Sequence, residues 1–151
     1  MVATVAAAFV LTSPAFHANG TIPRLYTCDG RNVSPPLRWT APPARTRSLA
    51  LLVQDPDAPG GSFLHWTIWS ISPRARSLAQ ATHGLPEGRN DAGRIGYTGP
   101  CPPSGTHRYV FRLYALRAPL RLAAGASGAA FERALRGKVL ATATLVGRYR
   151  R

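Results

Sequence analysis

SLALLVQDPDAPGGSFLHWTIWSI, residues 48–71, places two apolar runs on either side of a turn rich in proline and glycine. Ser48–Gln54 is almost continuously apolar, as a strand buried in a sandwich would be. Phe63–Ile71 is aromatic and β-branched, a composition typical of strands, and it contains Trp66 and Trp69 as candidates for core packing. With Gly60-Gly61 as the turn between them, this stretch predicts an antiparallel hairpin.

Other strand-like segments lie on both sides of this hairpin. Arg108–Leu116 has strand composition, Leu140–Val146 carries Thr142 and Thr144 on one face, and Phe9–Phe16 is a candidate strand near the start. Together with the hairpin, these segments predict five to eight short strands.

One late segment has helical spacing instead. Ser127–Arg136 places apolar side chains on one helical face, with Ser127 as a candidate N-cap and Gly137 as a candidate C-cap. The stretch Ser72–Cys101 has no apolar period, and a loop of that length often forms a functional rim.

Length and composition limit the class of protein. The chain has 151 residues, 45% of them hydrophobic, which fits one folded domain over residues 1–151. Glycine and proline number 14 each, which favours many turns over a helical bundle. No apolar run is long enough to cross a membrane. The start, Met1–Leu11, is apolar but lacks a basic n-region, so we expect a cytoplasmic protein, or an exported one if this start is a truncated or misassigned signal peptide.

The charge is strongly one-sided. Nineteen Lys and Arg residues face six Asp and Glu residues, which gives a net charge of +13. Such a field attracts nucleic acids, phospholipid headgroups or acidic ligands. The cations are scattered, however, and no helix-turn-helix, zinc-finger or aromatic RNA-binding motif is present, so we expect no specific nucleic-acid binding.

Two stretches concentrate residues that could carry chemistry. In the first, the prolines of D-P-D-A-P hold Asp55 and Asp57 after an apolar strand, and the hairpin should return His65 to their neighbourhood. The second, GYTGPCPPSGTHRY at residues 96–109, joins a rigid loop to a strand on which His107 and Tyr109 share a face. Imidazole and phenol groups are suitable hydrogen-bond donors to an anion.

These stretches resemble the two signature regions of the phosphatidylethanolamine-binding protein family. The resemblance is to the bacterial and archaeal branch of that family, which is called Raf-kinase-inhibitor-like. The first signature is similar to D-P-D-A-P…H-W and the second to G-x-x-G-P-x-P-P-x-G-x-H-R-Y. Weaker similarities, among them Tyr26–Gly30, extend the resemblance over about residues 11–147.

The resemblance implies a Greek-key β-sandwich of two antiparallel sheets with a short helix near the C-terminus. It also implies a small pocket for phosphate-like anions, including phospholipid headgroups, in a binding or inhibitor-like protein without a cofactor. The residues expected to bind the ligand are Asp55, His65, Pro103, His107 and Tyr109. Asp57, Gly99 and Pro100 are expected to shape the pocket.

Alternatives remain open for the function and for individual residues. Asp55 could merely stabilise a turn, Asp57 is favoured as a structural hydrogen-bond acceptor, and Arg108 should pair with one of these carboxylates. An inhibitor could act on a protease or kinase through the exposed loops of Ile71–Asn90. A weak hydrolase using an Asp–His pair is a further possibility, although no obvious nucleophile accompanies that pair, and a metal site is less favoured than an anion site.

The two cysteines, Cys28 and Cys101, both fall in family-like segments. They can form one disulfide, which is slightly favoured, or remain two reduced thiols as a cytosolic compartment would require.

Overall fold

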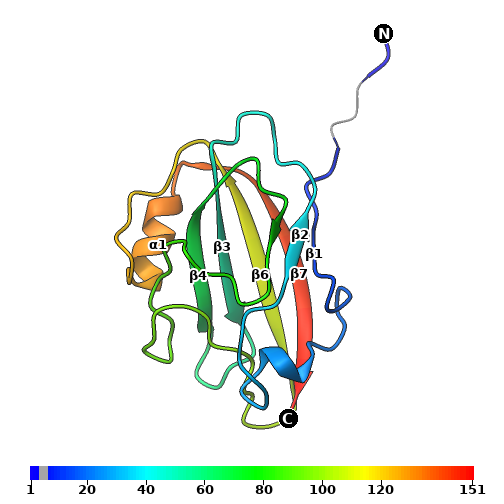
Figure 1. The fold of residues 1–151 in the computed structure, drawn as a ribbon, viewed down its shortest axis with the longest axis vertical. Helices are drawn as coiled ribbons and strands as arrows, with labels where there is room; N and C mark the ends of the chain where they lie inside the picture. Colours follow the sequence, from blue (N-terminus) through cyan, green and yellow to red (C-terminus); the bar gives the residue numbers. More distant parts are fainter. Residues whose placement is uncertain (4–6) are drawn as a thin grey trace.

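The computed structural model describes residues 1–3 and 7–151 and consists of two antiparallel sheets packed face to face (Figure 1). The smaller sheet contains β1 (Leu11–Thr12), β2 (Leu37–Trp39) and β5 (Ser77–Leu78), in the order β1-β2-β5. The larger sheet has the order β4-β3-β6-β7 and contains β3 (Ser48–Asp55), β4 (Phe63–Ile71), β6 (Thr106–Leu116) and β7 (Val139–Arg150). The predicted mostly β sandwich is therefore confirmed.

The hairpin β3–β4 forms where the sequence predicts it, and β6 returns to pair with the other side of β3. Between β4 and β6 the chain visits the smaller sheet through β5. This long return beside an earlier strand is the kind of connection that builds a Greek key. It makes β3 a central strand and brings the start of β6 next to the end of β3.

Three expectations about element boundaries need correction. The candidate strand Phe9–Phe16 shortens to β1, because Pro14 offers no amide and the Ser13 hydroxyl donates to the carbonyl of Pro36. The final strand is longer than Leu140–Val146, since β7 pairs with β6 along nearly its whole length. The stretch Ser72–Cys101 contains β5 and the isolated bridge Arg89–Ile95, and its Glu87 bridges to Ile68 of β4.

Both faces of the larger sheet are covered. Trp66, fully buried, packs between the two sheets, whereas Trp69 packs on the other face under the helix α1 (Gly128–Leu135) together with Phe131. The Ser127 hydroxyl caps α1 by accepting from the amide of Ala130 at 3.1 Å, as predicted. A short 3-10 helix, η1 (Arg24–Tyr26), lies near the end of the sheet where β3 ends.

No helix among the described residues is long and apolar enough to span a membrane. The apolar start Met1–Leu11 includes residues 4–6, which lie outside the described residues, so the signal-peptide expectation is not tested by the structure.

Candidate functional site

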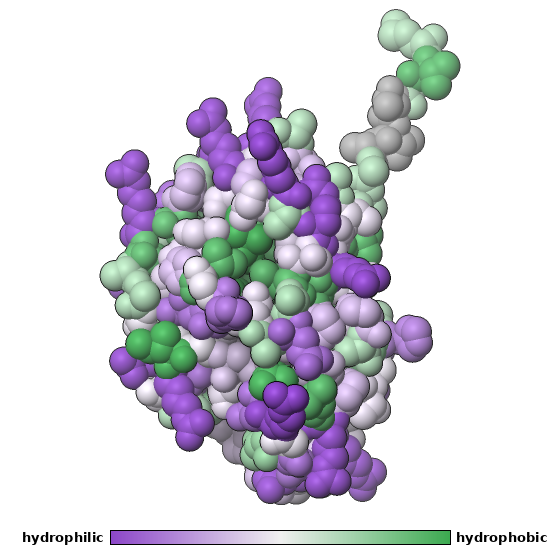
Figure 2. Space-filling model, viewed as in Figure 1, coloured by the Kyte–Doolittle hydropathy of each residue, from purple (hydrophilic) through white to green (hydrophobic). Residues whose placement is uncertain are grey.

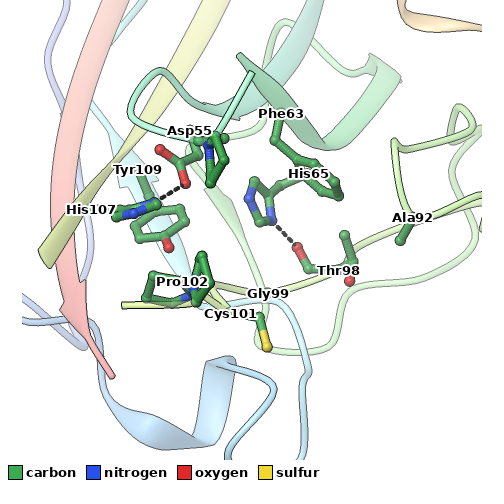
Figure 3. A pocket seen from close by; sticks show the side chains of 13 residues that line it. Asp55, Phe63, His65, Ala92, Thr98, Gly99, Cys101, Pro102, His107 and Tyr109 are labelled. Carbon is green, nitrogen blue, oxygen red and sulfur yellow. Dashed lines mark hydrogen bonds and ion pairs between the residues drawn. The ribbon is translucent and has the colours of Figure 1, made fainter. Parts of the chain in front are cut away.

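A pocket of about 310 Å³ opens at the end of the larger sheet where β3 ends and β4 and β6 begin (Figure 3). Its polar wall is made of Asp55, His65, His107 and Tyr109, which the sequence predicts as ligand-binding residues. The pocket is also lined by Ala58, Pro59, Phe63, Ala92, Thr98, Gly99, Cys101, Pro102 and Pro103. The structure thus brings all five predicted ligand-binding residues into one cavity, while their ligand roles stay predictions.

Asp55 and His107 form a buried pair at the centre of the site. His107 Nδ1 lies 2.6 Å from Asp55 Oδ2, and the two side chains are 10% and 5% exposed. The other carboxylate oxygen, Oδ1, accepts from the amide of Asp57 at 2.7 Å. An ionised carboxylate can only accept, so Nδ1 of His107 donates the proton in this bond. The other ring nitrogen, Nε2, does not take part in the bond to Asp55.

His65 is anchored to the backbone and not to the Asp pair that the hairpin was expected to bring near it. Its Nδ1 lies 2.7 Å from the carbonyl oxygen of Thr98, and a carbonyl can only accept, so Nδ1 is the donor. Burial lowers the pKa of His65, although the bond to Thr98 opposes that shift. The ring also packs between Phe63 and Tyr109, with ring centroids 4.8 and 5.2 Å away. Burial in this packing therefore favours the neutral form of the His65 imidazole.

Tyr109 contributes an unpartnered hydroxyl. Its side chain is almost fully buried, and its O–H has no acceptor among the described residues, although the backbone of Cys101 lies close enough to oppose the rise in its pKa. Burial, followed by the nearby charge of Asp55, raises the pKa of Tyr109 far above the ordinary range. The group therefore remains a neutral O–H donor in a pocket where no other described residue uses it.

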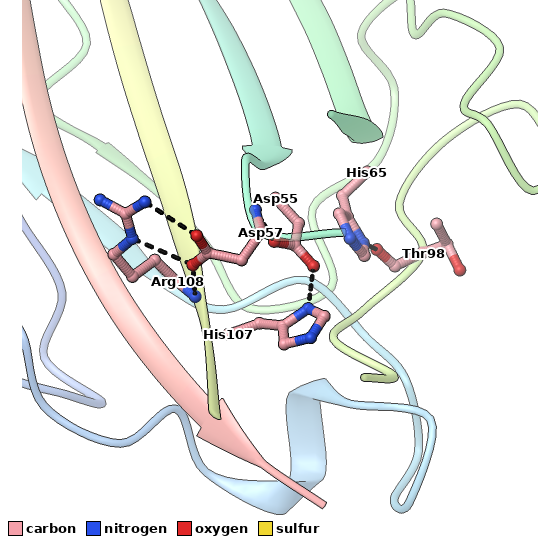
Figure 4. A network of polar contacts seen from close by, with 6 residues as sticks. All are labelled: Asp55, Asp57, His65, Thr98, His107 and Arg108. Atoms are coloured by element: carbon pink, nitrogen blue, oxygen red, sulfur yellow. Dashed lines mark hydrogen bonds and ion pairs between the residues drawn. The ribbon is translucent and has the colours of Figure 1, made fainter. Parts of the chain in front are cut away.

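Asp57 does not line the pocket, and its carboxylate is bound by Arg108. Its carboxylate accepts from the backbone amide of Arg108 at 2.9 Å and from two guanidinium nitrogens at 3.0 and 2.8 Å (Figure 4). These bonds lower the pKa of Asp57 to about 2. The predicted pairing of Arg108 with a carboxylate is present, because alternation along β6 turns Arg108 to the face opposite His107.

Gly99 and the Cys28–Cys101 disulfide fix the loop that forms one wall. A Cβ on Gly99 would overlap the carbonyl oxygen of Tyr26 and the side chain of Asn32, which itself accepts from the Gly99 amide at 2.7 Å. The disulfide between Cys28 and Cys101 is present, and the neighbouring carbonyl of Pro100 accepts from the Cys28 amide at 3.1 Å. Pro100 does not line the pocket.

Several pocket residues were not identified from the sequence. Thr98 lies inside the second signature stretch, which could have marked it as a pocket residue. It holds His65 through its backbone carbonyl, however, and any residue type could supply that group. Phe63 looks like any other aromatic residue of a strand, and Ala92 lies in a loop whose sequence carries no recognisable motif. Within the described residues, no group of three His, Cys, Asp or Glu side chains is placed to hold a metal ion.

Comparisons with known proteins agree with this architecture. A UPF0098 protein of Methanothermobacter thermautotrophicus is 48% identical over 148 residues, which cover 93% of this chain and 98% of the relative. The crystal structure of a phosphatidylethanolamine-binding protein homologue from Chlamydia trachomatis, CT736, superposes with a TM-score of 0.91 at 39% identity, covering 95% of this chain and 98% of the other. The structure of Escherichia coli YbcL, described as a member of the mammalian family, gives 0.89 at 32% identity, with 96% and 99% covered.

The family model for the phosphatidylethanolamine-binding protein matches residues 12–150, which include both signature stretches, every predicted site residue and all but one residue of the two sheets. With this match and relatives similar over almost their full length, the chain belongs to the phosphatidylethanolamine-binding protein family.

Proposed function

We propose that the protein binds a small ligand carrying a phosphate or carboxylate group in the pocket of Asp55, His65, His107 and Tyr109, and that it acts as a binding or regulatory protein. The observation that carries this proposal is the buried hydroxyl of Tyr109, whose O–H has no acceptor among the described residues. Leaving a buried polar group unsatisfied costs about 1–3 kcal/mol. An anionic oxygen in the pocket would accept from this hydroxyl and remove that cost.

The histidines determine the protonation that such a ligand needs. Both Nδ1 atoms are engaged, by Thr98 for His65 and by Asp55 for His107. In a neutral ring Nε2 is therefore an acceptor, which does not suit a fully ionised oxygen. Binding through Nε2 then requires a proton, taken from solution or supplied by a protonated phosphate. We therefore infer that anion binding strengthens as the pH falls.

Calorimetry with inorganic phosphate and with phosphoethanolamine tests the proposal. We expect His107→Ala to weaken both ligands at least about tenfold, since charged hydrogen bonds contribute about 1.5–3 kcal/mol. His17→Ala, a change at an exposed histidine outside the pocket, should leave binding unchanged. Wild-type affinity should be higher at pH 6 than at pH 7.5.

Equal affinity of wild type and the His107 variant, with both folded by circular dichroism, would refute the pocket assignment. Preference for phosphoethanolamine would indicate a headgroup ligand, and equal binding a free anion.

The buried Asp55–His107 pair also favours a second candidate, a weak hydrolase in which the pair activates water. We propose that the pair binds and does not catalyse. Cys101, the one cysteine of the lining, is held in a disulfide, and no described hydroxyl is hydrogen-bonded to either pocket histidine. Chromogenic phosphodiesters, esters and peptides should show turnover near background. Robust hydrolysis lost in both His107→Ala and Asp55→Asn would establish the hydrolase instead.

A further inference from the structure

The segments at one end of the larger sheet carry cations without any acidic residue. The end opposite the pocket is formed by the first residues of β3 and β7 and the last residues of β4 and β6. The strand pairs Ser48–Leu116, Leu49–Ile71 and Leu116–Val139 lie there. The adjoining segments 40–47, 72–76, 117–122 and 136–138 contain no Asp or Glu. We call this surface the cationic end, and define it by Arg45, Arg47, Arg74, Arg76, Arg117, Arg136 and Lys138.

These cations are not neutralised within the molecule. Among the described residues, ion pairs to carboxylates are made by His107, Arg108 and Arg151, none of which belongs to the cationic end. Arg45, Arg47 and Arg117 line one open hollow together, without a carboxylate. Figure 2 shows long hydrophilic side chains standing out from this end of the molecule.

Apolar residues from 7 to 10 lie at the same end. Val10 and Thr40 exchange hydrogen bonds, with the Thr40 amide donating to the Val10 carbonyl at 3.0 Å. Ala7 and Phe9 lie over the proline-rich loop 41–44, and Met1 and Val2 are exposed.

We propose that the cationic end docks on the surface of a lipid bilayer that contains anionic headgroups. Clustered Lys and Arg residues near such a surface contribute about 1 kcal/mol each, and adjacent apolar residues can enter the interface. Nucleic acid is the weaker candidate. The segments of the cationic end contain no Phe, Tyr or Trp on which bases could stack.

Docking in this orientation has a consequence for the pocket. β6 has 11 residues and runs from the pocket to the cationic end, a distance on the order of 35 Å at about 3.4 Å per residue. The pocket therefore faces away from the bilayer and takes its ligand from the aqueous side, not from the membrane on which the protein sits. This inference concerns a separate surface and does not depend on the anion pocket.

Vesicle co-sedimentation tests the docking surface. Full-length protein is mixed with phosphatidylcholine vesicles containing 30% phosphatidylglycerol, and with pure phosphatidylcholine vesicles. We expect binding to the anionic vesicles alone, weakening strongly between 0.05 and 0.3 M salt as charges are screened. The triple variant Arg45→Glu, Arg47→Glu, Arg117→Glu should bind roughly 100-fold more weakly, since each cation contributes about fivefold.

A matched triple variant provides the control. Arg31→Glu, Arg94→Glu, Arg150→Glu removes the same charge at exposed positions outside the cationic end and should retain most of the binding. An equal loss in both variants would overturn the proposal, because it would show an effect of net charge alone. No binding of wild type to anionic vesicles would also overturn it. Tighter binding to double-stranded DNA or poly(U) than to vesicles, lost in the first variant, would assign the surface to nucleic acid.

Discussion

Tyr109 places a hydroxyl in the interior where no described residue bonds to it, and this feature connects stability with function. A buried unsatisfied group lowers stability, and removing it can be neutral or stabilising. Such a position persists more readily if a ligand makes the missing bond.

We therefore expect Tyr109→Phe to change stability and binding in opposite directions. The free energy of unfolding should stay level or rise by up to about 1 kcal/mol, while affinity for phosphate should fall about fivefold or more. Chemical denaturation and calorimetry on the same samples measure both quantities. Tyr114→Phe, at a partly buried tyrosine outside the pocket, is the control. A loss of stability in the Tyr109 variant with unchanged affinity would mean that its hydroxyl is structural.

At the scale of elements, the site depends on segments tied together across the sequence. Gly99 approaches the backbone after η1, and the disulfide joins the loop of Cys101 to that of Cys28, 73 positions earlier. His107 comes from β6, and Asp55 from the end of β3, so their contact depends on the pairing of these two strands. The loop of residues 99–101, which forms one wall of the pocket, is thus fixed by backbone hydrogen bonds and by the disulfide.

Removing the disulfide should lower stability and loosen this wall. Closing a loop of this length contributes about 4 kcal/mol in the chain-entropy model. For the double variant Cys28→Ser, Cys101→Ser we expect the melting temperature to fall by roughly 10 °C, with weaker phosphate binding. Differential scanning calorimetry measures the first effect. Reductant should reproduce the fall in wild type and have no effect on the variant. Two freely alkylated thiols in native, oxidised protein would contradict the bridge.

At the scale of the whole molecule, few carboxylates oppose many cations. Six Asp and Glu residues face nineteen Lys and Arg residues, and the buried carboxylate, Asp55, is used in the pocket. The excess positive charge is left on the surface, most uniformly at the cationic end. We propose that one end binds a small ligand and that the other docks on an extended anionic surface.

The stability of the whole fold should fall with acid, partly through His65. Burial lowers its pKa, so the unfolded chain takes up a proton more readily than the folded one as pH falls below about 6.5. The contribution of neutral His65 is complete above that pH and is lost progressively below it. Asp57, whose pKa is lowered to about 2, adds a further loss in stronger acid, below about pH 4.

Thermal denaturation between pH 7.5 and 5 measures this effect. His65→Asn keeps a donor for the Thr98 carbonyl but does not titrate, so the decline of its melting temperature with acid should be shallower than that of wild type. His17→Ala should follow the wild-type decline. Parallel curves for all three proteins would show that His65 does not contribute.

The sequence by itself determined the local elements and the five residues expected to bind the ligand, all of which line the pocket. The apolar runs around residues 48–71 specified the β3–β4 hairpin, and Ser127 marked the start of α1, because periodicity and capping are local properties of the chain. The two signature stretches contained the polar residues that line the pocket, and Cys28 and Cys101 were the one possible pair.

Only the tertiary structure decided which of these side chains pair. The hairpin places His65 in the same pocket as Asp55, as expected, but the histidine bonded to that carboxylate is His107, which β6 brings from the other side of β3. Asp57 and Arg108 meet on the opposite face for the same reason. The orphan hydroxyl of Tyr109 and the gathering of scattered arginines at one end are also properties of the folded chain. Strand order and burial depend on contacts between residues far apart in sequence, and a local pattern does not encode them.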